Sequence, residues 1–264
     1  MSFIAENCDA PPKTELPSKP YIITQNEEMG NVAVKPKKHA EFREVVYRSA
    51  HWVLLEELRK KAAQVITALE SFRLNGLTHG SIARGDVNQR SDIDVFISEP
   101  QSSFLVETAL ERAGLSVNSR LLIQATPNYA MKAYIELGMG VNVSFPLMQM
   151  RRVDREFYKF SGEVNLAQLK TSVRVSGVDK RLMLIEPTAK GHAETSVINR
   201  EETVAKRLNI SVETILDRVH ALMKRDDVGR TGVFIKRELC PNETFELALK
   251  KLADENPAVR RRMR

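Results

Sequence analysis

Two aspartates stand one residue apart in the sequence SDIDVFIS, within an otherwise apolar run. Because alternate side chains of a β-strand point to opposite faces, Asp92 and Asp94 should share one face while Ile93, Val95 and Ile97 pack on the other. Two carboxylates held this close repel each other unless they share a proton, face solvent or bind a cation. Hard divalent cations such as Mg²⁺ prefer oxygen ligands of this kind. The spacing therefore indicates a metal site on a strand that otherwise belongs to the core.

A turn that could bind phosphate lies upstream, in the sequence GSIARG. The backbone amides beside Gly80, the hydroxyl of Ser81 and the guanidinium of Arg84 are groups that bind phosphate oxygens. Alone, such a turn is more often merely solvated, and the same holds for two aspartates at a strand edge. Together they favour a nucleoside triphosphate whose phosphates contact both the turn and a metal ion held by Asp92 and Asp94.

The segment GSIARGDVNQRSDIDVFI resembles the signature of the DNA polymerase beta-like nucleotidyltransferases, especially their minimal bacterial and archaeal members. More loosely, the whole chain resembles archaeal predicted nucleotidyltransferases with a C-terminal helix-turn-helix. The resemblance implies that Gly80 and Ser81 bind the triphosphate of an NTP and that Arg84 neutralises phosphate charge. It also implies that Asp92 and Asp94 hold two ions, Mg²⁺ or Mn²⁺, for the in-line displacement of pyrophosphate by a hydroxyl.

The third carboxylate that active members of this family need is missing from its expected strand, VNVSFP, which carries Asn142. An amide coordinates metal weakly and cannot accept a proton from the attacking hydroxyl. If the sequence GMG forms a hairpin loop, Leu137 pairs with Val141 and Glu136 with Asn142, which places Glu136 on the face of Asn142. Glu136 is then either a substitute acid or an exposed rim residue. The predicted catalytic residues are Asp92, Asp94 and Glu136, and the predicted metal ligands are these three and Asn142.

The rest of the sequence predicts an α+β fold, in which a nucleotidyltransferase palm with a mixed sheet and flanking helices precedes a C-terminal winged helix-turn-helix. Residues 1–40 hold five of the 11 prolines and indicate an extended arm. Residues 41–160, which the resemblance covers, form the nucleotidyltransferase-like domain and open with a helix, or two with a bend, over residues 41–73. Residues 161–198 form a β-hairpin connector, and residues 199–264 form the winged helix-turn-helix with a basic tail.

The C-terminal module is predicted from TVAKRLNIS and SVETILDRVHALMKR, which indicate two helices, the second with a serine cap. The sequence GRTG then predicts a wing hairpin between DDV and VFIKREL. Binding of nucleic acid, mainly through phosphates, is expected from basic residues of the second helix, the wing and the tail: Arg218, Lys224, Arg230, Lys236, Arg237 and the residues from Arg260. Dimerisation or protein docking is the alternative, which Glu213 and Asp217 on the second helix favour.

Composition bears on the partner and the cellular location of the protein. The 264 residues carry 40 Lys and Arg against 34 Asp and Glu, a net charge of +6 that suits nucleic acid without requiring it. Cys8 and Cys240 are too few for a disulfide framework, and no apolar run is long enough to span a membrane. A cytoplasmic protein without a membrane partner is therefore expected.

Two functions remain open from the sequence. In the first, the chain is a metal-dependent nucleotidyltransferase that moves a nucleotide from an NTP to a hydroxyl of a nucleic acid or a protein. In the second, the loss of the third acid has ended catalysis. The chain is then a nucleic-acid-binding factor that acts on DNA as a regulator, or on structured RNA or the ribosome. Both are compatible with a homo-oligomer.

Overall fold

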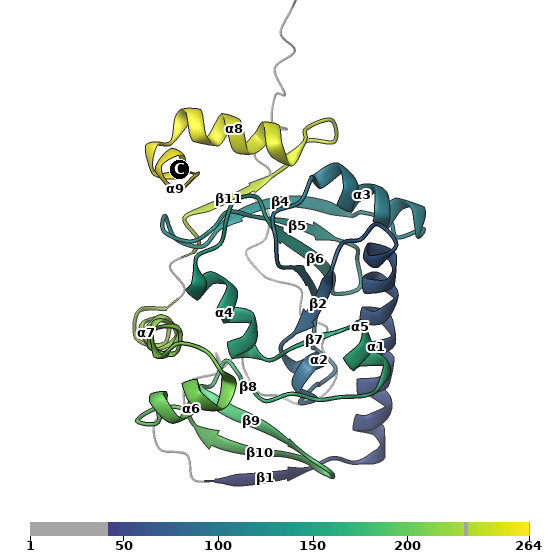
Figure 1. Ribbon diagram of the computed structural model, residues 1–264, viewed down its shortest axis with the longest axis vertical. Coiled ribbons are helices and arrows are strands. Elements are labelled where there is room, and N and C mark those ends of the chain that lie inside the picture. Colours follow the sequence, from purple (N-terminus) through teal and green to yellow (C-terminus); the bar gives the residue numbers. More distant parts are fainter. Residues whose placement is uncertain (1–41, 230–231, 264) are drawn as a thin grey trace, which may run out of the picture. The chain divides into compact units, whose positions relative to one another are not determined.

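The computed structural model describes residues 42–229 and 232–263, which lie within one compact unit, Val34–Arg264. The arm predicted over residues 1–40 and the predicted nucleic-acid contact Arg230 lie outside the described residues. Figure 1 shows the elements, which in chain order are β1 (Arg43–Val46), α1 (Ser49–Glu70), β2 (Gly76–His79), α2 (Ser81–Arg84), β3 (Ile93–Ile97), α3 (Ser103–Arg112), β4 (Ser119–Gln124), β5 (Lys132–Glu136), β6 (Val141–Pro146), α4 (Arg152–Ser161), β7 (Glu163–Asn165), α5 (Leu166–Lys170), β8 (Gly177–Val178), β9 (Met183–Thr188), β10 (Gly191–Ser196), α6 (Glu201–Leu208), α7 (Val212–Val228), β11 (Ile235–Glu238), α8 (Phe245–Glu255) and α9 (Pro257–Met263).

A mixed seven-stranded sheet carries the predicted site and runs in the order β11-β4-β5-β6-β3-β2-β7. Within this sheet β3 and β6 pair in parallel, and the other neighbours are antiparallel. The mixed sheet and its helices confirm the predicted α+β organisation. The hairpin predicted around GMG is present as β5 and β6, with Glu136 opposite Asn142.

The two faces of this central sheet differ in character. On one face Ile93, Val95 and Ile97 are at most 2% exposed and belong to the main core, to which α1 and α3 also contribute. On the other face α4 packs on the sheet, and the ring of Tyr158 stacks on that of Phe96 with 3.5 Å between centroids. Burial of the apolar face, at about 25 cal/mol per Å², stabilises the strand whose other face carries the aspartates.

The helix predicted over residues 41–73 begins later than expected. Arg43–Val46 form β1 instead, which pairs with β10 from Arg43 opposite Glu194 to Val46 opposite Gly191. A Cβ at position 191 would lie 1.8 Å from the carbonyl oxygen of Val45, so this close pairing requires glycine. A partner strand far along the chain therefore overrides the local helical pattern, and α1 starts at Ser49.

A second sheet, in the order β1-β10-β9-β8, contains the predicted hairpin of β9 and β10. It shares a second core with α6 and α7, the two helices predicted for the C-terminal module, through residues such as Leu184, Val204 and Ile215. Ser211 caps α7, because its hydroxyl accepts a hydrogen bond from the amide of Thr214 at 3.3 Å.

The prediction of a wing hairpin is wrong. Residues 226–228 continue α7, and Ile235–Glu238 form β11, which pairs with β4 of the central sheet rather than with a wing strand. The edge of β4 offers backbone amides and carbonyls that β11 satisfies. The following helix α8 escapes prediction, although Thr244 caps it and Pro257 follows its end, as is typical of helices.

None of the described helices combines the length and the apolar character needed to cross a membrane.

A buried arginine connects α1 to the turn after β2. Arg59 is 7% exposed, and its Nε and Nη2 donate to the carbonyl oxygens of Ile82 and Ala83, each at 3.0 Å. Burial, assisted by the charge of Arg174, lowers the pKa of the Arg59 guanidinium to about 10. The group is therefore still charged at neutral pH, and its two hydrogen bonds fix α2 against α1.

Arg59→Met should lower the free energy of unfolding by about 2–4 kcal/mol, because two buried carbonyl groups lose a charged donor. The melting temperature, followed by circular dichroism, should then fall by roughly 4–16 °C. Lys60→Met is the matched control, since it removes only the exposed ion pair with Glu56 and should shift the melt by less than about 4 °C. Equal losses in the two variants would contradict the anchoring role of Arg59.

Candidate active site

Asp92 and Asp94 lie at the start of β3, on the face opposite the core. Asp92 directly precedes the strand and is exposed, whereas Asp94 lies within it and is half-buried. Ile93 between them is 2% exposed. The alternation expected from the sequence is therefore present, and the two carboxylates are close enough to interact electrostatically.

Ionisation of both carboxylates is unfavourable in the folded chain. Burial raises the pKa of Asp94 above its ordinary value, against the opposing effects of a hydrogen bond from Asn142 and the charge of Lys180. Burial, followed by the charge of Asp94, raises the pKa of Asp92, and Lys180 again opposes the shift. A bound divalent cation would reverse this balance, because it favours the charged form of both groups.

Asn142 is the neighbour of Asp94 in the parallel pair of β3 and β6. Its Nδ2 donates to Oδ1 of Asp94 at 3.3 Å. The amide thus places a hydrogen-bond donor at the position where the sequence resemblance leads us to expect an acid. A third acid here would add negative charge beside Asp92 and Asp94, whose ionisation the fold already disfavours. Its amide oxygen remains the type of ligand that Mg²⁺ and Mn²⁺ bind.

Glu136 has the predicted register but is not grouped with the two aspartates. It is exposed, and its carboxylate accepts a hydrogen bond from the hydroxyl of Ser119 on the neighbouring strand β4. Over residues 42–229 and 232–263, no three side chains of His, Cys, Asp or Glu come together as a group that could hold a metal ion. The candidate metal ligands here are thus two acids and one amide, whose oxygens are of the type that hard divalent cations bind.

The predicted phosphate-binding turn follows β2, the strand next to β3. Gly80 has a φ of 77°, a conformation that favours glycine, and no atom lies within 4 Å of where its Cβ would be. The hydroxyl of Ser81 donates to that of Ser91 at 3.2 Å, and Ser91 directly precedes Asp92 in the chain. The turn and the carboxylates are thus connected through one hydrogen bond.

Arg84 is engaged with the protein itself. It is 5% exposed and forms an ion pair with Asp86, with 2.8 Å between Nη2 and Oδ2. Its Nη1 donates to the carbonyl oxygens of Ser161, at 2.6 Å, and Val178, at 3.4 Å. These contacts connect the turn to α4 and β8, and they favour a positioning role for Arg84 over the predicted contact with phosphate.

Lys180 lies near the candidate site, although no motif in the sequence marks it. It is exposed in the turn between β8 and β9, and its charge acts on both Asp92 and Asp94. The turn is held by Arg181, which pairs with Asp179 at 2.5 Å. No motif marks Lys180, because its position near the aspartates depends on the packing of the second sheet beside the central one.

Two of the predicted nucleic-acid contacts, Arg218 and Arg237, are engaged within the protein. The guanidinium of Arg218 lies 4.8 Å from the ring centroid of Phe157 on α4, and its Nε is buried without a hydrogen-bond partner. Arg237 pairs with Glu243 at 2.6 Å. Of the described residues predicted on the second helix and the wing, Lys224 on α7 and Lys236 on β11 are the exposed ones.

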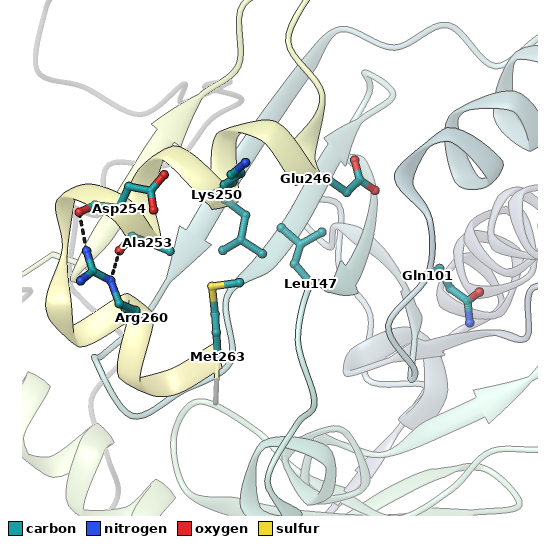
Figure 2. Close-up of a pocket in the computed structure, with 9 residues that line it drawn as sticks. Gln101, Leu147, Glu246, Lys250, Ala253, Asp254, Arg260 and Met263 are labelled. Atoms are coloured by element: carbon teal, nitrogen blue, oxygen red, sulfur yellow. Dashed lines mark hydrogen bonds between the residues drawn. The ribbon is translucent and has the colours of Figure 1, made fainter.

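Arginines of the basic tail make contacts within the protein, and Arg262 donates to the carbonyl oxygens of Asn128, at 3.0 Å, and Gln149, at 2.8 Å. Arg260 donates to the carbonyl oxygens of Ala253, at 2.9 Å, and Asp254, at 2.6 Å (Figure 2). Beside these residues α8 and α9 border a pocket of about 490 Å³, which Leu147 and Met263 also line. The pocket contains none of the predicted triphosphate or metal ligands, so we assign it no part in the chemistry.

Comparison with known proteins gives a match to the part of the chain that carries Asp92 and Asp94. Residues 54–158 match the family model described as a nucleotidyltransferase domain. No curated protein matches the chain significantly. The matched range contains all the residues predicted to bind triphosphate or metal: Gly80, Ser81, Arg84, Asp92, Asp94, Glu136 and Asn142. Lys180 lies beyond it.

Asp94→Asn should stabilise the metal-free chain at neutral pH, because it removes a carboxylate whose ionisation the fold disfavours. The pKa of Asp94 is raised from 3.8, so the wild-type chain loses stability as the pH rises from that value through the raised pKa. The advantage of the variant should therefore be full at pH 7 and shrink as the pH approaches 3.8.

Urea unfolding over a pH series, in buffer that contains a chelator, measures this difference. Glu57→Gln makes the same charge change at an exposed position of α1 and should follow the wild-type curve. An Asp94→Asn chain that is less stable than the wild type at pH 7 would argue against electrostatic strain at the site.

Proposed function

We propose that the chain is a metal-dependent nucleotidyltransferase, which transfers a nucleotide from an NTP to a hydroxyl group. The observation that carries the proposal is the pair of Asp92 and Asp94 on the polar face of β3, beside the turn of Gly80 and Ser81 and inside the matched nucleotidyltransferase domain. The fold holds these carboxylates together although their ionisation is unfavourable. A ligand that compensates them is the simplest reason for the arrangement.

The carboxylates of Asp92 and Asp94 and the amide oxygen of Asn142 would hold Mg²⁺ or Mn²⁺. Such an ion, when bound, offsets phosphate charge and makes an attacking hydroxyl more acidic. Gly80 and Ser81 would bind the triphosphate through the backbone and the hydroxyl.

Three basic residues would support this reaction in two ways. Lys180 would offset negative charge on the phosphates as pyrophosphate leaves. Arg59 and Arg84 would keep the turn in its binding conformation before the substrate arrives, since both donate to carbonyl oxygens around it. A turn that is already ordered needs little rearrangement when the NTP binds.

The acceptor in this proposal is a nucleic acid of the cytoplasm, either DNA or structured RNA. The net charge of +6 supports an anionic partner, and Lys224 and Lys236 are exposed basic residues outside the matched domain. A contact led by phosphates alone does not distinguish DNA from RNA.

A second candidate function is binding of metal and NTP, or of nucleic acid, without transfer. Asn142 favours it, because its amide donates to Asp94 and cannot remove a proton from an acceptor. Glu136, which is hydrogen-bonded to Ser119 and grouped with no other acid in the described chain, does not weaken this alternative.

Binding of metal and NTP should stabilise the wild-type chain. At a ligand concentration of about 100 times Kd, mass action adds about 2.7 kcal/mol, or roughly 5–11 °C in the melting temperature. The double variant Asp92→Asn with Asp94→Asn should lose this shift. Glu99→Gln, at an exposed position two residues beyond β3, should keep it. A wild-type melt that ignores millimolar Mn²⁺ with each NTP would refute the site.

Asn142→Asp separates the two candidate functions. The new carboxylate adjoins Asp94, so the metal-free melting temperature should fall, while the shift caused by Mn²⁺ should grow because a ligand has been added. Transfer is measured with each radiolabelled NTP and total cellular RNA. Transfer by the wild-type chain supports the first function, and transfer that appears only in Asn142→Asp supports the second.

Glu136→Gln tests the substitute acid under the same conditions. It should abolish transfer if Glu136 takes the part of the missing carboxylate, since the amide cannot accept a proton. Transfer that survives this change would remove Glu136 from the catalytic residues.

A further inference from the structure

His79 ends β2 and stands between the two parts of the proposed site. In the antiparallel pair of β2 and β3, Thr78 lies opposite Val95. The next residue along β2, His79, therefore adjoins Asp94 and shares its face of the sheet. Gly80, where the proposed phosphate turn begins, directly follows His79 in the chain. An imidazole between a carboxylate and a phosphate turn is placed to contact the substrate itself.

The hydrogen bonds of Ser161 fix the position of the ring proton. Nδ1 of His79 lies 3.1 Å from Oγ of Ser161 on α4. The Ser161 hydroxyl has one hydrogen, which it donates to the carbonyl oxygen of Tyr158 at 2.9 Å. Oγ of Ser161 therefore accepts a hydrogen bond from His79, and Nδ1 carries the proton. Nε2 of the neutral ring is then unprotonated and presents a lone pair.

The ring stays neutral at physiological pH. Burial, followed by the charges of Lys132 and Arg84, lowers the pKa of His79 to about 3. A base this weak is poorly suited to remove a proton from a hydroxyl near pH 7, so general-base catalysis is not its role. Nε2 can still accept a hydrogen bond, because this requires only the lone pair.

No group of the described chain uses this lone pair. None of residues 42–229 and 232–263 forms a hydrogen bond with Nε2 of His79. Glu163, opposite His79 on β7, is engaged by Arg155 through two hydrogen bonds at 2.6 and 2.7 Å. Among the described residues His79 also forms no three-residue metal-binding group with Asp92 and Asp94. The lone pair is therefore left for a ligand or for solvent.

The cover that α4 provides over this face of the sheet ends at His79. Phe96, which lies beneath α4, is 0% exposed. Asp94, two residues earlier on the same face of β3, is partly exposed, and so is His79. On its covered side the imidazole packs edge-to-face with Tyr158, with 4.8 Å between ring centroids. A ligand at Asp94 would thus meet a ring whose orientation is already fixed.

The chemistry of an NTP decides which of its groups could meet Nε2. Ionised phosphate oxygens accept hydrogen bonds and do not donate them, so they cannot bind an unprotonated nitrogen. The ribose hydroxyls are donors, and the sugar is the part of the nucleotide that is joined to the phosphates. With the phosphates at Gly80 and Ser81, the sugar is the first donor group within reach of the preceding residue.

We propose that His79 is a specificity residue whose Nε2 accepts a hydrogen bond from a ribose hydroxyl of the bound NTP. The proposal rests on the proposed function and adds the part of the substrate that the chain recognises. A nucleotide that lacks this hydroxyl would leave Nε2 without a donor and would bind more weakly.

Binding of nucleotide analogues tests the proposal without any transfer. The probes are the α,β-methylene analogues of the four NTPs with Mn²⁺, each also in its 2′-deoxy and 3′-deoxy form, and their Kd values are measured by calorimetry. The wild-type chain should bind one of the two deoxy forms roughly tenfold more weakly than the ribonucleotide, as expected for the loss of one hydrogen bond. The form that loses affinity identifies the hydroxyl.

Two variants separate the contact with the sugar from the contact with Ser161. His79→Asn keeps an amide donor near the position of Nδ1 but has no atom at the position of Nε2, so it should bind all three sugar forms equally. His79→Gln places an amide oxygen near the position of Nε2 and loses the donor to Ser161, so it should keep most of the preference. The opposite pattern would show a structural role through Ser161 and would overturn the proposal.

Inorganic triphosphate, which has no sugar, is the control ligand. With Mn²⁺ it should stabilise the wild-type chain and both variants equally in thermal melts. Nitrogen-15 NMR of the wild-type chain tests the proposal even if a variant does not fold: the Nε2 resonance should be that of an unprotonated nitrogen and should shift with the NTP analogue but not with triphosphate.

A protonated Nε2 would overturn the proposal, and so would equal affinity of the wild-type chain for all three sugar forms. Discrimination among the four bases without discrimination among the sugars would assign the contact to the base instead and would also overturn it. If neither triphosphate nor any NTP analogue binds with Mn²⁺, the proposed function itself is refuted, and the role of His79 falls with it.

Discussion

The site depends on one feature of β3, the alternation of its side chains between two faces. Ile93, Val95 and Ile97 are buried in the core, and each such side chain contributes about 1.5–3 kcal/mol. Burial and the charge of Asp94 raise the pKa of Asp92. The apolar face of the strand anchors it in the core and so keeps the two carboxylates on one face. The remaining elements then have to supply a phosphate site and an acceptor site around a pair that is already in place.

Hydrogen bonds connect the C-terminal helix α7 to the part of the chain that carries the candidate site. The amide and hydroxyl of Ser211 and the hydroxyl of Thr214 donate to the carboxylate of Glu156 on α4. Tyr129, before β5, donates to Asp217 on α7. The N-terminal end of α7 is thus held by α4, the helix that packs on the polar face of the central sheet. These hydrogen bonds connect α7, through α4, to the sheet that carries Asp94.

Features that depend on neighbouring residues were predictable from the sequence, and features that depend on distant partners were not. The faces of β3 follow from a period of two, and the pairing of Glu136 with Asn142 follows from the length of a three-residue loop. Val45 and Val46 fit a strand as well as a helix, and only β10 decides between them. The same holds for β11, which was predicted to pair with residues 226–228 and pairs with the edge of β4 instead. Lys180 belongs to this second class, since its place near Asp94 results from the packing of two sheets.

The two sides of the proposed site are built to different degrees, and this difference agrees with the chemistry. On the phosphate side, buried guanidinium groups of Arg59 and Arg84 fix the turn of Gly80 through carbonyl oxygens. A triphosphate is the same in every NTP, so a rigid site loses nothing. On the side of β6 the chain offers the exposed Glu136 and the amide of Asn142 in place of an acid. Neither Asn142 nor the exposed Glu136 is a base fixed beside Asp94. In the proposed reaction, activation of the attacking hydroxyl would therefore depend on the bound ion and on the orientation of the acceptor, and selectivity would lie in the binding of the acceptor rather than in the phosphate turn.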